Sequence, residues 1–222
     1  FEELFSDMSK LPFSFKYGSQ IYHGLDRDFN AVWENGSIIG RHRDGLEVRV
    51  EIKCNFEYAQ FEWTVYFENT SQQESETLSE LLGADLKINK PHPELLYFIG
   101  DDAMDSYAYA PMRVPMRAGT FLEFQPVGGR PTSFMTPYYR FETQDEGMFL
   151  TVGWPGQWRA RFDARKIDNY DYVNDYTVLF TADSQINGRL RPGEKIRTPL
   201  ISVMLYDSCL LYTSDAADDL IG

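Results

Sequence analysis

The residues best suited to chemistry in this chain lie in one segment, 126–158. A glycine-rich bend containing Arg130 comes first, and a Gly/Pro turn with Trp154, Gln157 and Trp158 closes the segment. An indole face stacks on the apolar face of a pyranose, and amide or guanidinium groups hydrogen-bond with its hydroxyls. The pattern therefore predicts a surface for a neutral sugar. The expected substrate-binding residues are Trp154, Trp158, Gln157 and Arg130.

A structural role is the alternative for the same residues. Trp158 begins an alternating run, so its ring can belong to the core at a sheet edge, and Trp154 can do the same. Arg130 can brace the bend instead of contacting a ligand. Gly128 and Gly129 are expected to supply backbone conformations that other residues disfavour. Both interpretations stay open at the level of sequence.

The elements that must position this segment are predicted to be strands. Apolar and polar residues alternate over 46–52 and over 61–67, and a short polar and aromatic link joins the two runs, which predicts an antiparallel hairpin with one solvated face. Further strands are expected at 82–88, 95–99, 121–124, 139–141, 148–152, 158–162, 176–180 and 200–205. The segment 75–82 is a weak helix candidate with few apolar positions.

So many short strands, separated by regular turn signals such as Asn35-Gly36 and Glu146-Gly147, predict an all-β fold. The length of 222 residues favours a large antiparallel β-sandwich of two extended sheets over an immunoglobulin-sized module. No internal repeat or low-complexity block divides the chain. We therefore expect one sandwich domain over residues 1–207.

Bulk composition restricts the partners. The net charge of −13 disfavours nucleic acid and anionic membrane surfaces, because both are themselves negatively charged. No apolar run approaches the roughly 20 residues that a membrane helix needs. The chain has 2 cysteines, too few for a disulfide scaffold. No phosphate-cradling glycine loop is present, and no cofactor is predicted.

Other potential sites are weaker. Asp101, Asp102 and Asp105 could bind a divalent cation, but a solvated acidic loop is the simpler interpretation in so acidic a chain. The segment 168–175 resembles a calcium loop superficially, yet it lacks the glycine and the glutamate that an EF-hand requires. The three histidines are far apart in the sequence, without ligand spacing. No metal site and no nucleophile elbow are therefore predicted.

Several phrases resemble, in order, the N-terminal β-sandwich domain of α-galactosidase-type enzymes of glycoside hydrolase family 36. The family phrases are "PFSFxYGG", "TGLEVR", "VEWxxYFxNTG", "PxGGRPS", "GWxGQW" and "HPGEEIRTP". They correspond here to residues 11–18, 44–49, 62–70, 126–131, 153–158 and 191–199. The resemblance covers about 11–205. Ser19 replaces a second glycine and Arg191 replaces a histidine, and neither departure touches the tryptophan segment.

This resemblance implies a division of labour within a longer protein. In such enzymes a (β/α)8 barrel follows the sandwich, carries two catalytic aspartates and hydrolyses α-galactosides with retention. Those aspartates would lie beyond Leu205, so no catalytic residue is expected here, and this chain alone is expected to be inactive. By resemblance the sandwich packs on the barrel and helps to wall the substrate cleft, with Trp154 as the best candidate. Family members commonly form homo-oligomers.

Two other hypotheses remain beside this one. The chain could be a free-standing carbohydrate-binding module that uses the same tryptophans, or a purely structural domain whose aromatic residues are core. The last residues, 208–222, differ in character from the rest. The run 209–219 resembles translated sequencing-adapter sequence, and we interpret 208–222 as an artefactual or disordered tail and exclude it from the fold.

Overall fold

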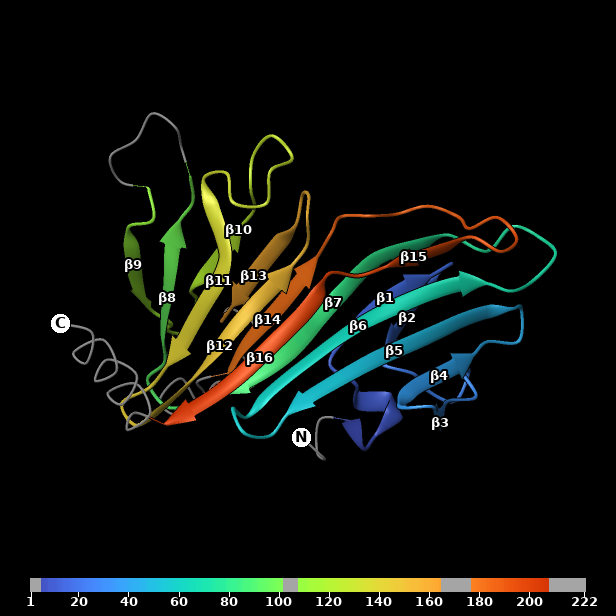
Figure 1. Ribbon diagram of the computed structural model, residues 1–222, viewed down its shortest axis with the longest axis horizontal. Helices are drawn as coiled ribbons and strands as arrows, with labels where there is room; N and C mark the ends of the chain where they lie inside the picture. Colours follow the sequence, from blue (N-terminus) through green and yellow to red (C-terminus); the bar gives the residue numbers. More distant parts are fainter. Residues whose placement is uncertain (1–4, 102–107, 165–176, 208–222) are drawn as a thin grey trace.

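The computed structural model describes residues 5–101, 108–164 and 177–207, and their regular structure consists of strands plus one short 3-10 helix, Met8–Lys10. The strands form two antiparallel sheets stacked as a sandwich (Figure 1). The all-β prediction is confirmed. Among the described residues, no helix is long or apolar enough to cross a membrane.

The smaller sheet has 6 strands. In spatial order they are β10 (Phe121–Phe124), β13 (Arg159–Asp163), β14 (Thr177–Asp183), β7 (Leu78–Asn89), β1 (Ser14–Tyr17) and β2 (Gln20–His23).

The larger sheet has 10 strands. In spatial order they are β3 (Val32–Glu34), β4 (Ser37–Arg41), β5 (Leu46–Asn55), β6 (Gln60–Asn69), β16 (Leu200–Asp207), β12 (Glu146–Gly153), β11 (Met135–Glu142), β8 (Glu94–Ile99) and β9 (Pro111–Pro115), and β15 (Lys195–Arg197) pairs with β6.

The strands with clear alternation are the ones that the sequence predicts correctly. β5 and β6 form the expected hairpin, paired from Leu46↔Asn69 to Asn55↔Gln60. Leu46, Val48 and Val50 of β5 are buried, whereas the residues between them are only partly covered. β1, β2, β3, β4, β9 and β15 are short and lie outside the predicted set. Runs of three to five residues are too short to establish a period of two.

The helix expected over 75–82 is wrong, because Leu78 begins the long strand β7. Glu80 has a φ of +50°, and the pairing of β7 with β1 shifts register beside it. This irregularity brings both Leu78 and Leu81 into the core, three residues apart. The same spacing occurs on one face of a helix, so the pattern was ambiguous. The segment is a strand because it pairs with β1 on one side and with β14 on the other.

Large aromatic side chains fill the space between the sheets. Phe15 contacts Phe67 edge-to-face, with ring centroids 5.0 Å apart, and both rings are buried. Trp63 on β6 donates its indole N–H to the carbonyl oxygen of Gly83 on β7 at 2.7 Å, which ties the larger sheet to the smaller one. A buried indole N–H needs such a partner. The core therefore holds the two sheets in one fixed relation.

Candidate functional site

The structure brings the two halves of the predicted sugar-binding segment together. The bend at 126–132 follows β10, and the turn at 154–158 joins β12 to β13. Gln157 Nε2 donates to the carbonyl oxygen of Pro126 at 2.5 Å, and Trp158 Nε1 donates to that of Pro131 at 2.8 Å. The turn therefore holds the bend at two points.

Trp158 is a core residue. Its side chain has no exposed area, and its ring meets that of Tyr139 edge-to-face at 6.5 Å. A ring without exposed area has no face on which a pyranose can stack. The burial of Trp158 and its hydrogen bond to Pro131 therefore favour the alternative in which this residue belongs to the core and does not contact a sugar directly.

Trp154 is only partly buried, and it packs against the core. The guanidinium carbon of Arg197, on β15, lies 4.8 Å from the centroid of its ring. This cation–π contact covers part of the indole and links the turn to β15. Trp154 is thus the predicted tryptophan that keeps some solvent access.

The polar residues of the segment stabilise the bend through hydrogen bonds. The amide of Gln157 is engaged with Pro126 as described above. Arg130 is exposed, and its guanidinium contacts the hydroxyl of Ser133 at 3.4 Å. Gly128 and Gly129 have φ values of +72° and +76°, which confirms the prediction that they supply conformations unfavourable to other residues. Arg130 alone among the predicted polar residues projects into solvent.

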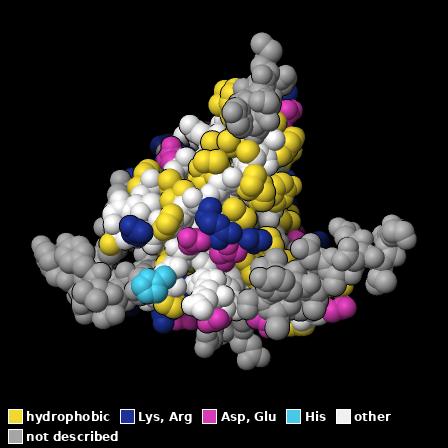
Figure 2. All heavy atoms as spheres, turned by 90° about the vertical axis from the view of Figure 1, so that its left-hand side faces the viewer, with side chains coloured by type: hydrophobic (Ala, Val, Ile, Leu, Met, Phe, Trp, Pro, Cys, Tyr) yellow, Lys and Arg dark blue, Asp and Glu magenta, His cyan; other side chains and the backbone are white. Residues whose placement is uncertain are grey.

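Exposed apolar side chains gather at the same end of the sandwich. Figure 2 shows hydrophobic groups on the face that carries β8, β9 and β11, above a cluster of arginine and acidic side chains. On β9, Arg113 forms an ion pair with Glu94 at 2.7 Å and another with Glu142. The exposed apolar residues here are Tyr109, Met112, Val127, Phe134 and Tyr138. Sequence reasoning did not identify them, because exposure of an aromatic residue leaves no local pattern.

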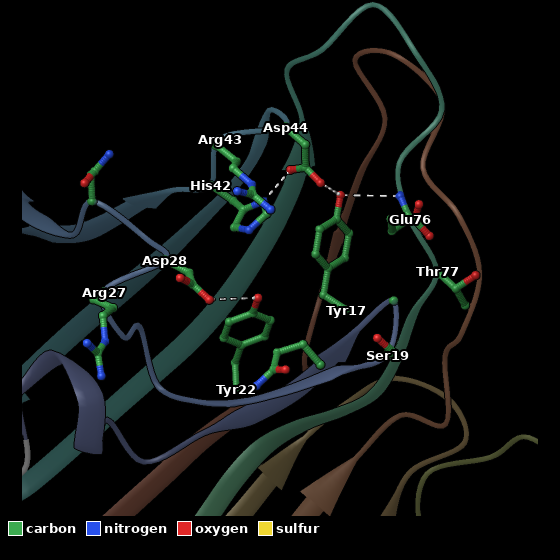
Figure 3. A pocket seen from close by; sticks show the side chains of 13 residues that line it. Tyr17, Ser19, Tyr22, Arg27, Asp28, His42, Arg43, Asp44, Glu76 and Thr77 are labelled. Atoms are coloured by element: carbon green, nitrogen blue, oxygen red, sulfur yellow. Dashed lines mark hydrogen bonds and ion pairs between the residues drawn. The ribbon is translucent and has the colours of Figure 1, made fainter.

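A second site is a polar cavity of about 990 Å³ at the opposite part of the sandwich, beside the β1–β2 turn (Figure 3). Asp44 is one of the residues that line it. Tyr17 donates its hydroxyl to Asp44 Oδ2 at 2.8 Å, and His42 Nδ1 lies 2.6 Å from Asp44 Oδ1. Tyr22 donates to Asp28 at 3.4 Å on the neighbouring wall. Arg27 and Arg43 also line this cavity.

The electrostatics of this cavity do not favour acid catalysis. Burial by itself would raise the pKa of Asp44, but the hydrogen bonds from His42 and Tyr17 outweigh it and hold the pKa below its ordinary value. Burial, and then the bond to Asp44, raise the pKa of Tyr17. Asp44 is therefore an ionised acceptor and Tyr17 a neutral donor at neutral pH. The arrangement suits hydrogen bonding, not proton delivery.

The sequence offered no signal for this cavity. Tyr17 and Asp44 are 27 residues apart. They meet because the two sheets stack on each other. Tyr17 ends β1 of the smaller sheet, and Asp44 precedes β5 of the larger sheet. His42 appeared in the sequence only as an isolated histidine without ligand spacing. Its neighbours are the rings of Tyr17, at 5.6 Å, and Phe29, at 5.2 Å.

No group of three or more His, Cys, Asp or Glu side chains forms a possible metal site within the described residues. Of the weak candidates weighed above, Asp101 belongs to the described chain and forms an isolated bridge with Ser133. Asp102, Asp105 and the segment 168–175 lie outside the described residues.

Comparison with known proteins yields matches in structure only. No protein-family model and no curated protein sequence matches the chain. The GH36 α-galactosidase AgaB from Geobacillus stearothermophilus matches with a TM-score of 0.65 and 13% identity, over 90% of this chain and 30% of that chain. An α-galactosidase from Lactobacillus brevis matches with a TM-score of 0.62 and 14% identity, over 88% of this chain and 26% of that chain.

The galactosidase domain of the α-galactosidase–sucrose kinase AgaSK gives a TM-score of 0.60 and 16% identity, over 87% of this chain and 27% of that chain. The chain therefore has the fold of a sandwich present in GH36 α-galactosidases, and it spans about 30% of the length of AgaB. The resemblance inferred from the sequence is confirmed at the level of the fold.

Proposed function

We propose that residues 1–207 are the N-terminal accessory domain of a retaining α-galactosidase-type glycoside hydrolase, and that the catalytic (β/α)8 barrel follows in the complete protein. The observation that carries this proposal is the coincidence of two independent likenesses. The family phrases recur in order along the sequence, and the fold matches GH36 α-galactosidases over 90% of this chain but only 30% of theirs.

The chemistry of the described residues supports an accessory role. Retaining hydrolysis needs two carboxyl groups about 5–5.5 Å apart, one of them protonated at neutral pH. Asp44, which lines the polar cavity beside the β1–β2 turn, is instead held ionised by His42 and Tyr17. The acid and the nucleophile are therefore assigned to the barrel, at the ends of its strands.

The end of the sandwich that carries the 126–132 bend is proposed to face the substrate cleft. Trp154 would line it with its exposed part, and Arg130 would donate to sugar hydroxyls there. Gln157 and Trp158 would act from beneath, through their bonds to the bend. Related solved structures are α-galactosidases in complex with raffinose and stachyose, which supports a neutral galactoside as the ligand class.

Two measurements test this proposal. The source DNA should continue in frame beyond the codon for Asp207 into a barrel with two aspartates at strand ends, once adapter-derived reads for 208–222 are removed. The chain itself should not hydrolyse an aryl α-galactoside. A native stop codon directly after residue 222 in clean reads, or turnover at enzyme-like rates, would overturn the accessory-domain assignment.

A free-standing carbohydrate-binding module is the second candidate, and the exposed aromatic residues favour it. The same sequencing experiment separates the two. A native stop codon together with saccharide binding that is lost in Trp154→Ala would establish the module, whereas a downstream barrel frame would exclude it.

A further inference from the structure

Two exposed aromatic side chains flank the end of β8. Tyr109 is 58% exposed and Phe134 is 43% exposed. The amide of Tyr109 donates to the carbonyl oxygen of Ile99 at 3.0 Å, and the amide of Gly100 donates to that of Phe134 at 2.9 Å. The two residues thus sit on opposite sides of one strand end. Two strand spacings separate them, which is about 10 Å.

Both residues adopt an unfavourable backbone conformation. Tyr109 has a φ of +62° and Phe134 a φ of +65°. Bulky side chains rarely occupy this left-handed region, and the strain persists only where the surroundings impose it. Such outliers concentrate at ligand clamps and other functional positions. Two of them on neighbouring exposed aromatic residues point to a use for the rings.

The surrounding backbone clamps Phe134 in place. Asp101 donates its amide to Thr132 at 2.8 Å, and Phe134 donates its own to Asp101 at 3.3 Å. The approach at Gly100 is so close that a Cβ there would lie 2.0 Å from the carbonyl oxygen of Thr132. This crowding fixes the strand end against the bend.

The core braces the same bend from beneath. Trp158 holds Pro131, Gln157 holds Pro126, and the amide of Val127 donates to Ser133 at 3.2 Å. A rigid aromatic surface loses little conformational freedom when a ligand binds, and preorganisation of this kind raises affinity.

We propose that Tyr109 and Phe134 form a platform for a neutral saccharide, an inference that rests on the proposed function and extends it to residues outside the tryptophan segment. The span of about 10 Å suits one or two sugar rings. The charges beside the platform, Asp101 and Arg130, are opposite in sign, which suits an uncharged ligand with hydroxyls.

Titration of the chain with raffinose tests the platform. Wild-type protein should bind saturably at concentrations up to the order of 50 mM. Phe134→Gly and Tyr109→Gly should each weaken binding by about tenfold, since an aromatic contact is lost. Each should also raise the melting temperature by about 2–4 °C, because glycine relieves the strain. The rise in melting temperature shows that the variant still folds.

Tyr58→Ala is the matched control, because Tyr58 is also 58% exposed but lies in the turn of the β5–β6 hairpin. Its binding should equal that of the wild type. Absence of saturable binding by the wild type would overturn the platform, and so would undiminished binding by both glycine variants. Loss of binding in Trp154→Ala alone would move the sugar to the tryptophan turn. None of these binding results bears on the accessory-domain proposal, which the sequencing experiment tests separately.

Discussion

Removal of a single oxygen atom from the core should stabilise this protein. Tyr139 is 2% exposed, and its hydroxyl has no hydrogen-bond partner among the described residues. The rings of Phe124 and Phe162 lie at 5.3 and 5.1 Å from its own. A buried hydroxyl without a partner costs about 1–3 kcal/mol. Tyr139→Phe keeps the ring, so we expect the free energy of unfolding to rise by about 1–2 kcal/mol.

The same substitution at Tyr17 should have the opposite sign. Tyr17 is 5% exposed, but its hydroxyl donates to the ionised Asp44 at 2.8 Å. Hydrogen bonds to charged groups contribute about 1.5–3 kcal/mol. Tyr17→Phe should therefore lower the free energy of unfolding by about that amount. The pair isolates hydrogen bonding, because the chemical change is identical at both positions.

Urea denaturation followed by circular dichroism measures both effects. The midpoint should move up for Tyr139→Phe and down for Tyr17→Phe, with unchanged slopes. Each kcal/mol corresponds to about 2–4 °C in melting temperature for a domain of this size. If Tyr139→Phe destabilised the protein as much as Tyr17→Phe, the hydroxyl of Tyr139 would have a partner and the reasoning would be refuted.

Four further predictions concern the same framework. Stability should fall as the pH drops below 3.8, the ordinary pKa of Asp44, because the unfolded chain takes up a proton there before the folded chain does. Denaturation at a series of pH values should show a weaker dependence for Asp44→Asn. Above about pH 10 stability should fall again, since the raised pKa values of Tyr17 and Tyr139 keep them neutral only in the folded state. Gly100→Ala should cost about 2–3 kcal/mol through its clash with Thr132, whereas Gly156→Ala, whose added Cβ would lie 3.6 Å from its nearest neighbour, should be nearly neutral in the same melts. Trp158→Phe should cost about 2–4 kcal/mol in unfolding free energy through a void and the unpaired carbonyl of Pro131, and a change below 1 kcal/mol would contradict the bracing role.

The strands that could be predicted from the sequence are those in which apolar and polar residues alternate clearly. β5 and β6 are each 10 residues long and half-buried, so their alternation is explicit in the chain. β7 was ambiguous because a bulge at Glu80 interrupts its alternation. β9 contains two prolines at its ends and has no buried residue, which is typical of an edge strand that carries little hydrophobic pattern.

The candidate site was predictable only in part. The residue types at 126–158 indicated a structured, aromatic turn, and the structure joins its two halves. The orientation of Trp158 was set by the pairing of β13 with β10 and β14, which sequence does not display. The positive φ values of Tyr109 and Phe134 arise from the contacts around Ile99 and Asp101. Nothing in the residue types of either position signals such a conformation.

The polar groups of the 126–158 segment are used mainly inside the protein. The indole N–H of Trp158 and the amide of Gln157 are both engaged with backbone carbonyls of the bend. Groups bonded in this way hold a loop rigid but have less capacity left for a ligand. Rigidity is what permits Phe134 to remain strained and exposed. Gln157 and Trp158 therefore build the support, and the ligand-facing role that we propose falls to the exposed residues above it.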